Sequence, residues 1–281
     1  MIRRSIGLGV VSATIAMVSF AIPTQAQESA AVVATVQESA PIPADQIPPN
    51  IKDAVASPDR PADDKSLDAG RKPDQILAFF GIAPGMQVAE LFAGNGYSTE
   101  LLARAVGPTG KVYSQNSIEG WQPYSPVPFP EKFRKSGEAW EARLKNPALN
   151  NVVPVKKAFS APDLLPVAPG SLDAVLMNMN YHDMVLFKID RDKVNAAVFK
   201  ALKPGGFYDI VDHSAKDGSG IKDVSLHRID EKFLIADIQK AGFKLAAASR
   251  ALRHPEDDRT WMVFKKRGQT DRFMLKFVKS Q

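Results

Sequence analysis

VAELFAGNGY, residues 88–97, joins an apolar run to two closely spaced glycines. This stretch predicts a buried strand, residues 87–92, that carries the acid Glu90 near its carboxyl end. A turn at Gly94 and Gly96 then opens a helix and brings backbone N–H groups close to any ligand at the carboxyl edge of a parallel sheet. Two glycines alone favour a tight strand-to-helix turn that binds nothing, so the flanking sequence has to decide.

The flanking segments extend this strand and turn into a βαβ unit. Leu101, Leu102, Ala105 and Val106 recur at helical spacing and predict a helix over residues 98–106. A turn of glycine and proline follows, and the next apolar segment is predicted to be a second strand. Strand, helix and strand within about 30 residues predict a parallel sheet with a right-handed crossover.

The same alternation continues to the end of the chain and predicts one α/β domain, residues 66–281, with a doubly wound, mostly parallel sheet. The further predicted strands are 111–115, 152–155, 172–177, 206–211, 243–247 and 272–278, and the further helices are 73–80, 131–145, 193–202 and 231–241. Residues 118–130 form an aromatic and proline-rich insertion that contains Trp121, Tyr124 and Phe129. These rings either line a substrate pocket or pack over the edge of the sheet.

The first 26 residues have the three parts of a secretory signal. Arg3 and Arg4 precede an uncharged apolar run, residues 6–22, and small residues follow before a predicted cleavage after Ala26. The run is short for a membrane span, which needs about 20 apolar residues. We therefore expect export to the periplasm, with no stable membrane span. An uncleaved anchor and a twin-arginine signal for folded cargo are the alternatives.

Composition narrows the classes of partner. The chain has no cysteine, which excludes a disulfide framework and a lipid-modified cysteine anchor. Removing Arg3 and Arg4 with the signal lowers the net charge from +5 to +3, with 34 basic residues against 31 acidic ones. No block of lysine and arginine stands out, so no nucleic-acid partner is expected. Residues 27–65 are rich in Pro and Ala and show no hydrophobic period, so they are predicted to be an arm or linker and not a packed unit.

Two motifs give the chain a resemblance to a known superfamily. The stretch from Glu90 to Gly96 resembles the first motif of class I S-adenosylmethionine (SAM)-dependent methyltransferases, an acid followed by x-Gly-x-Gly-x-Gly. LKPGG, residues 202–206, resembles the turn before their fifth strand. Four segments are similar to a little-described group of predicted exported bacterial methyltransferases, namely residues 71–73, 181–183, 212–214 and 226–230.

Over about residues 70–281, the resemblance implies a Rossmann-like methyltransferase fold, with a seven-stranded sheet that ends in an antiparallel strand pair. It also implies SAM as the cofactor and a small or medium-sized molecule as the methyl acceptor. A dinucleotide site fits less well, because GNGYST, residues 94–99, lacks the third glycine of Gly-x-Gly-x-x-Gly.

The resemblance assigns cofactor-binding residues around the glycine turn and after the second strand. They are Glu90, Phe92, Ala93, Gly94, Gly96 and Asn116. The carboxylate of Glu90 suits the ammonium of SAM, and the two glycines leave N–H groups unhindered. Phe92 stands where the motif has its first glycine. Asn116 stands where these enzymes usually have an acid for the ribose hydroxyls, and its amide can bind a hydroxyl only without charge assistance.

Polar residues after the fourth and fifth strands predict the acceptor end of the site. His182 is the first candidate for a general base, with Asp183 to orient it or to cap the following helix, and His213 follows the next strand. An ordinary loop histidine bonded to the backbone is the alternative for His182. The predicted substrate-binding residues are Tyr181, Trp121, Arg71 and His227, and Arg71 either anchors an anion or pairs with Asp68.

Three functions from different classes are consistent with these residues. The leading hypothesis is a SAM-dependent methyltransferase with a small-molecule acceptor. The second is a non-catalytic binding protein on a methyltransferase scaffold, since a fold does not fix a function. The third is a metal-dependent enzyme built from His182, Asp183, His213 and His227. Because their spacing matches no short metal motif, no metal site is predicted. The acceptor and the oligomeric state stay open.

Overall fold

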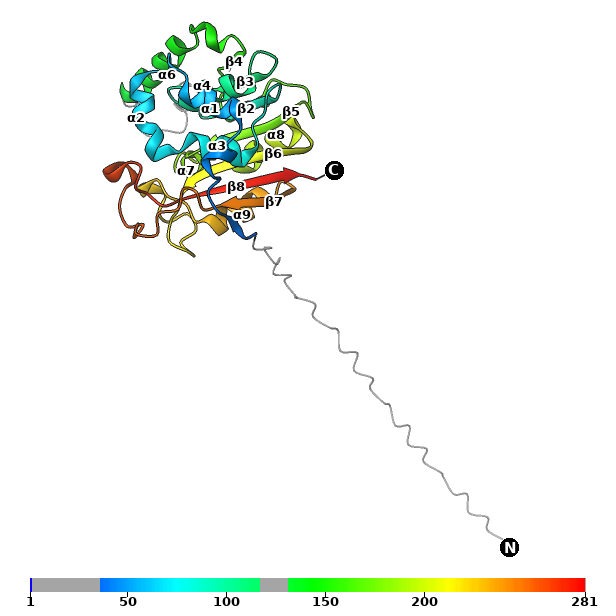
Figure 1. The fold of residues 1–281 in the computed structure, drawn as a ribbon. Helices are drawn as coiled ribbons and strands as arrows, with labels where there is room; N and C mark the ends of the chain where they lie inside the picture. Colours follow the sequence, from blue (N-terminus) through cyan, green and yellow to red (C-terminus); the bar gives the residue numbers. More distant parts are fainter. Residues whose placement is uncertain (2–35, 117–130, 281) are drawn as a thin grey trace. The chain divides into compact units, whose positions relative to one another are not determined.

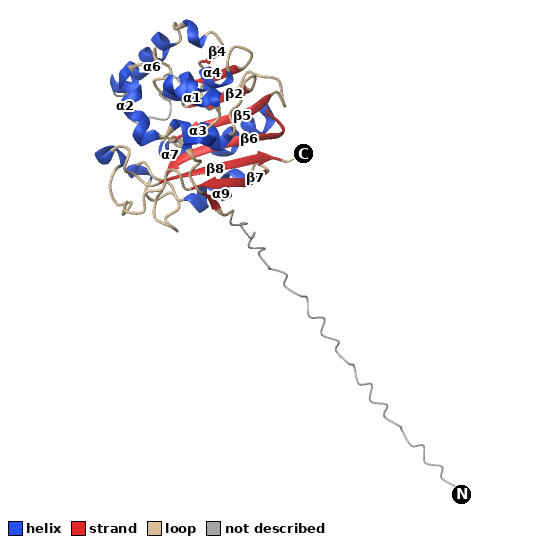
Figure 2. Cartoon of the chain, viewed as in Figure 1, coloured by secondary structure: helices blue, strands red, loops and turns tan. Residues whose placement is uncertain are grey.

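One mixed β-sheet carries the fold (Figures 1 and 2). The computed structural model describes Met1, residues 36–116 and residues 131–280, and from Val36 onward these belong to one unit. Eight strands lie in the order β1-β7-β8-β6-β5-β2-β3-β4. β8 runs antiparallel to β6 and β7, and the other neighbouring pairs are parallel. The strands are β1 (Glu38–Ser39), β2 (Gln87–Leu91), β3 (Lys111–Gln115), β4 (Val152–Val155), β5 (Leu172–Asn178), β6 (Leu202–His213), β7 (Phe243–Ser249) and β8 (Arg272–Lys279).

Helices cover both faces of the sheet and bury two hydrophobic cores. Alternate residues of β5 serve opposite cores: Ala174 and Leu176 enter one, and Val175 and Met177 enter the other. Burial on both faces explains why these strands read as continuous apolar runs. The α-helices are α1 (Pro49–Ala56), α2 (Ala62–Arg71), α3 (Pro73–Phe80), α4 (Tyr97–Val106), α6 (Glu131–Arg143), α7 (Tyr181–Leu186), α8 (Arg191–Ala201) and α9 (Glu231–Gln239). The 3-10 helices are η1 (Ala44–Gln46), η3 (Pro147–Leu149), η4 (Val224–Leu226) and η5 (Val263–Lys266).

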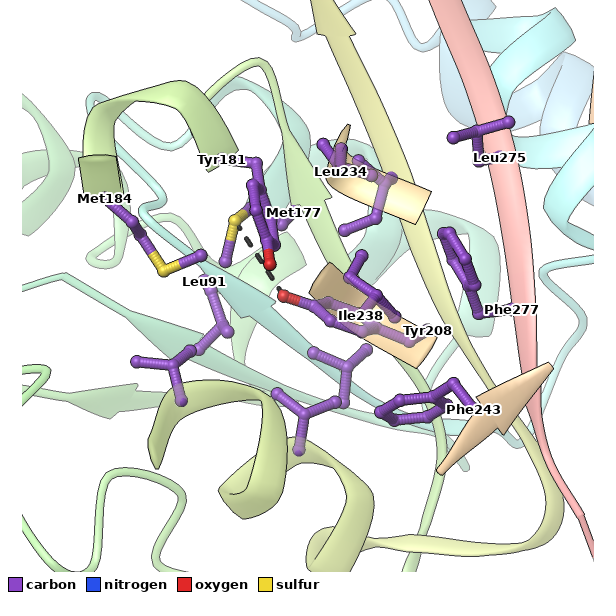
Figure 3. Close-up of a cluster of buried hydrophobic side chains, with 14 of the residues drawn as sticks. Leu91, Met177, Tyr181, Met184, Tyr208, Leu234, Ile238, Phe243, Leu275 and Phe277 are labelled. Atoms are coloured by element: carbon purple, nitrogen blue, oxygen red, sulfur yellow. Dashed lines mark hydrogen bonds between the residues drawn. The ribbon is translucent and has the colours of Figure 1, made fainter. Parts of the chain in front are cut away.

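The core on the α8 and α9 face is rich in aromatic and sulfur-containing side chains (Figure 3). Tyr208 of β6 places its hydroxyl 3.9 Å from the sulfur of Met177, and Phe243 of β7 packs edge-on against Phe199 of α8. The strand order and directions, with helices on both faces, confirm the predicted doubly wound, mostly parallel sheet with a C-terminal antiparallel pair.

Residues 36–65 differ from the prediction of an unpacked arm. They form β1, η1, α1 and the start of α2, and Ile51 and Ala54 of α1 are buried in the core beside α4. The prolines that look like helix breakers in the sequence stand at helix starts: Pro49 is the first residue of α1, and Pro61 is the N-cap of α2. β1 pairs with β7 and makes the sheet eight-stranded, where seven strands are predicted.

Three predicted features lie wholly or partly outside the described residues. These are the signal, residues 1–26, the first part of the arm, residues 27–35, and most of the insertion, including Trp121, Tyr124 and Phe129. Within the part of the chain that the structure describes, no helix has the length and apolar character needed to cross a membrane.

The order of the strands creates a crevice beside β2. The chain passes from β2 through α4 to β3 on one side, whereas β5 is added later on the other side. In open α/β sheets, ligands bind where the strand order reverses in this way, outside the carboxyl ends of the strands. Glu90, Asn178 and Asp212 lie at or near the carboxyl ends of β2, β5 and β6.

Candidate functional site

A cavity of about 830 Å³ lies at these strand ends, within the size range of small-molecule sites. Glu90, Ala93 and Gly94 from the β2–α4 turn line it. His182 and His227, which come from α7 and from the residue after η4, line the same cavity. Predicted cofactor residues and predicted acceptor residues thus share one space.

The β2–α4 turn keeps the backbone geometry of a glycine turn although Phe92 stands in it. Phe92, Gly94 and Gly96 all have positive φ, at 60°, 59° and 85°. For Phe92, this left-handed geometry costs roughly 1–2 kcal/mol. Its amide donates to Gln115 Oε1 at 3.1 Å, and its ring stacks on Phe159 with centroids 3.8 Å apart. Phe92, which stands where the family motif has its first glycine, is therefore anchored against Phe159.

Two of the predicted cofactor residues support the turn from outside the cavity. A Cβ added to Gly96 would lie 2.9 Å from Arg143 Cδ and 3.2 Å from Trp140 Cδ1, so the glycine allows α6 to pack closely. Asn116 donates from its side-chain amide to the carbonyl oxygen of Gly94 at 2.7 Å. Among the described residues, neither Gly96 nor Asn116 lines the cavity, unlike Gly94.

Glu90 ends a buried chain of hydrogen bonds. Trp140 Nε1 donates to Ser114 Oγ at 3.0 Å, the hydroxyls of Ser114 and Thr99 lie 2.9 Å apart, and Thr99 donates to Glu90. Burial raises the pKa of Glu90 to about 7, although the hydrogen bonds from Thr99 and Ser98 and the charge of Arg143 act in the opposite direction. The carboxylate is thus buried, oriented and ready to ionise beside a cation.

His182, Asp183 and His227 bring their donor atoms together on the cavity wall. Both oxygens of Asp212 hold His182: Oδ2 accepts from the backbone N–H at 2.9 Å, and Oδ1 lies 2.6 Å from Nδ1. The other ring nitrogen, Nε2, lies 3.1 Å from His227 Nδ1 and 3.4 Å from Asp183 Oδ1. Burial lowers the pKa of His182, but the charges of Asp212 and Asp183 outweigh this and raise it to about 9. When no other cation lies beside it, His182 therefore holds a proton between carboxylates near neutral pH.

His213 lines the cavity next to this group but stands apart from it. Its ring centroid is 6.1 Å from that of His182, and its buried Nδ1 has no hydrogen-bond partner among the described residues. Burial is the main reason why the pKa of His213 lies well below its usual value, and the charges of His182, Arg272 and Arg228 lower it further. His213 is consequently a neutral ring beside a charged one.

Arg71 and Arg272 add positive charge to the wall. Arg71 does not pair with Asp68, whose carboxylate is taken by Arg60 and by the Tyr97 hydroxyl at 2.8 and 2.6 Å. It lies instead over the Tyr97 ring, at 4.2 Å. Arg272 is 2% exposed and donates to the carbonyl of Gly70, and burial together with Arg71 lowers its pKa to about 10. Neither arginine forms an ion pair with a described carboxylate, so both are available to an anionic group.

Tyr181 is placed differently from its prediction as a substrate-binding residue. It is the first residue of α7, and its side chain enters the core shown in Figure 3. Its hydroxyl donates to Asp237 Oδ2 at 3.0 Å and accepts from Asn195 Nδ2 at 2.9 Å. Tyr181 is therefore a structural residue and not a cavity residue.

Sequence reasoning also missed two residues of the site. Asp212 precedes His213 at the end of a predicted strand, so its position pointed to the same edge of the sheet. Arg272 begins the last strand, and only the antiparallel direction of that strand brings its first residue to this edge. No local pattern in the sequence marks Arg272.

Comparison with known proteins identifies the fold. No family model matches the chain. A SAM-dependent methyltransferase from Aquifex aeolicus is 19% identical, with a TM-score of 0.51 over 77% of this chain and 96% of that one. An arsenic(III) SAM methyltransferase from Chlamydomonas reinhardtii is 18% identical, with a TM-score of 0.52 over 83% of this chain and 74% of that one. The [4+2]-cyclase SpnF is 14% identical, with a TM-score of 0.53 over 75% and 81%. The chain has the Rossmann-like fold of class I SAM-dependent methyltransferases, and since a cyclase shares it, the reaction has to be argued from the site.

Proposed function

We propose that this protein is a SAM-dependent methyltransferase that acts on a small or medium-sized acceptor. The observation that carries the proposal is the shared cavity, which is lined by Glu90 and Gly94 on one side and by His182, Asp183 and His213 on the other. A methyl group passes in line from the sulfonium of SAM to a nucleophile, so cofactor and acceptor must lie within one enclosed space.

The cofactor part of the proposal rests on the β2–α4 turn. Glu90 accepts the ammonium of SAM in a charge-assisted hydrogen bond, and the backbone around Ala93 and Gly94 approaches the amino-acid end of the cofactor. Phe92 contributes an apolar wall beside them. Asn116 acts by holding Gly94 in place through its side-chain amide.

The acceptor part rests on the histidine side of the cavity. His213 lines the cavity and its Nδ1 forms no hydrogen bond with a described residue, so we assign to its neutral ring the proton from an O–H, N–H or S–H nucleophile. His182 is a positioning residue, because Asp212 fixes it and it in turn faces Asp183. Arg71 binds an anionic part of the ligand, in keeping with its position on the wall and with the absence of an ion pair between it and any carboxylate of the described residues.

Calorimetric titration of the purified protein with S-adenosylhomocysteine tests the cofactor assignment. We expect one site per chain and a Kd in the micromolar range, with NAD⁺ as a negative control because the turn lacks the third glycine of a dinucleotide site. SAM should behave similarly, and production of S-adenosylhomocysteine then provides a screen for acceptors. A folded protein that takes up neither ligand would favour a binding protein that has kept only the scaffold.

We further propose that the protein is exported to the periplasm after cleavage behind Ala26. The support is the pattern of residues 1–26, with two arginines, an apolar centre and small residues before Gln27. Expression of the full sequence in a Gram-negative host, followed by N-terminal sequencing, should give Gln27 as the first residue in the periplasmic fraction. Recovery of the intact chain from the cytosol or the membrane would contradict this proposal.

A further inference from the structure

Three donor atoms form a nearly equilateral triangle on the cavity wall, two from consecutive residues of α7 and one from the residue after η4. His182 Nε2 and His227 Nδ1 lie 3.1 Å apart, Asp183 Oδ1 lies 3.4 Å from the first, and it lies 3.3 Å from the second. Zinc binds histidine nitrogen and carboxylate oxygen at about 2.0–2.2 Å, which places neighbouring donors of a tetrahedral site about 3.3–3.5 Å apart. The triangle has almost the size that three such ligands require.

Hydrogen bonding within the triangle explains this arrangement less well. A charge-assisted bond between a histidine and a carboxylate is expected at roughly 2.7–2.9 Å, and both distances to Asp183 are longer. Asp183 Oδ1 is buried and forms no hydrogen bond with any described group. A buried carboxylate oxygen without a hydrogen bond is costly unless something else neutralises it.

The surrounding residues present His182 in the manner of a metal ligand. Buried Asp212 binds its Nδ1, which leaves Nε2 directed at the triangle, and carboxylate–histidine pairs of this kind orient the ligands of many metal sites. His227 is held with a left-handed backbone, φ 58°, a geometry that non-glycine residues rarely adopt. The His227 N–H donates to the Val224 carbonyl at 2.9 Å, and this hydrogen bond fixes His227 at the end of η4.

We propose that His182, Asp183 and His227 bind one divalent transition-metal ion, with zinc as the best match to the donors and their spacing. Because all three residues line the cavity, a fourth coordination position faces the space in which the acceptor would bind. Three protein ligands with an open position are typical of catalytic rather than structural zinc sites.

The role of this ion in methyl transfer rests on the proposed function. A divalent ion bound there would make a coordinated acceptor O–H or S–H lose its proton more readily, and His213, the proposed base, would take that proton. The freed electron pair then forms the bond to the methyl carbon while the S–C bond of SAM breaks, which gives the methylated acceptor and S-adenosylhomocysteine. The substrate class is accordingly one with a metal-binding hydroxyl or thiol.

Cobalt(II) titration of the purified protein, expressed without a polyhistidine tag and treated with chelator, tests the site. We expect one equivalent of Co²⁺ with the intense visible absorption of a tetrahedral complex, and displacement of that absorption by Zn²⁺. His227→Ala should weaken Co²⁺ binding at least ~100-fold. Loss of a residue that only hydrogen-bonds to a metal ligand already lowers metal affinity about 10–100-fold, and His227 is itself a proposed ligand. The side chain of His227 is 21% exposed, so this variant is expected to fold.

His254→Ala is the matched control, since His254 pairs with Glu256 and does not line the cavity. It should bind cobalt like the parent protein, and Asp183→Asn should resemble His227→Ala. Absence of stoichiometric Co²⁺ uptake by the folded protein, or equal uptake by His227→Ala, would overturn the proposal. Cobalt binding needs no SAM, so failure of this site and failure of the methyltransferase proposal give separate results.

Discussion

Replacing Glu90 with glutamine should weaken S-adenosylhomocysteine binding by about 10–100-fold at pH 8. This follows from loss of a charge-assisted hydrogen bond in a buried site, worth roughly 1.5–3 kcal/mol. Glutamine has nearly the same shape and can still accept the hydrogen bond from Thr99, so the variant tests the charge and not the packing. Calorimetry of the two proteins side by side provides the measurement.

The effect should depend on pH in a defined direction. The pKa of Glu90 is about 7 in the folded protein, and the ligand ammonium favours the ionised form. At pH 6 only about a tenth of the carboxylate is ionised, so the affinity of the parent protein should fall roughly tenfold between pH 8 and pH 6. Glutamine does not titrate, hence the difference between the two proteins should narrow over the same range. The ligand titrates equally in both experiments and cancels in the comparison.

Stability should change in the opposite sense to affinity. Burial raises the pKa of Glu90 from 4.5 to about 7, so folding favours the protonated form and stability falls as the pH rises from about 4.5 through 7. Without ligand at pH 8, Glu90→Gln should therefore be more stable by about 3 kcal/mol in urea unfolding. Glu231→Gln, at a carboxylate outside the cavity, should leave affinity unchanged. A Glu90 variant that is less stable and binds normally would mean that Glu90 has only a structural role.

The α/β core could be predicted from the sequence because its strands are buried on both faces and its helices follow glycine or proline signals. The predicted strand bounds at residues 111–115 and 152–155 match β3 and β4, and the predicted helix 73–80 matches α3. Residues 36–65 could not be predicted in this way. Their helices α1 and α2 are short and begin at or directly after a proline, and α1 is stabilised by packing onto α4.

The site was predictable only where its residues follow strand ends. Glu90, His182 and His213 lie at the edge that the parallel sheet defines, and the cavity contains all three. Long-range packing decides the rest. The ring of Phe92 turns onto Phe159, and Asn116 turns back onto Gly94. Such side-chain directions depend on neighbours that are distant in the sequence.

Arg228→Met should destabilise the protein by about 3–5 kcal/mol, because it leaves a buried carboxylate without its cation. Arg228 and Asp257 are fully buried, and the guanidinium binds both oxygens of Asp257 at 2.8 and 3.2 Å. It also donates to the carbonyls of Ser214 and Trp261 at 3.0 and 3.1 Å. Methionine fills a similar volume but provides none of these bonds. Urea unfolding monitored by circular dichroism measures the loss.

This ion pair connects the segment between η4 and α9 to the segment between β7 and β8, which supplies Val263, Phe264 and Arg267 to the cavity wall. Losing it should expose that segment to proteases before the rest of the chain unfolds. The double variant Arg228→Met/Asp257→Asn removes the unpaired charge and should recover part of the lost stability. If the double variant is no more stable than the single one, the hydrogen bonds to Ser214 and Trp261 stabilise the segment and the charge pair does not. The wall beside His227 would then depend on those carbonyl contacts alone.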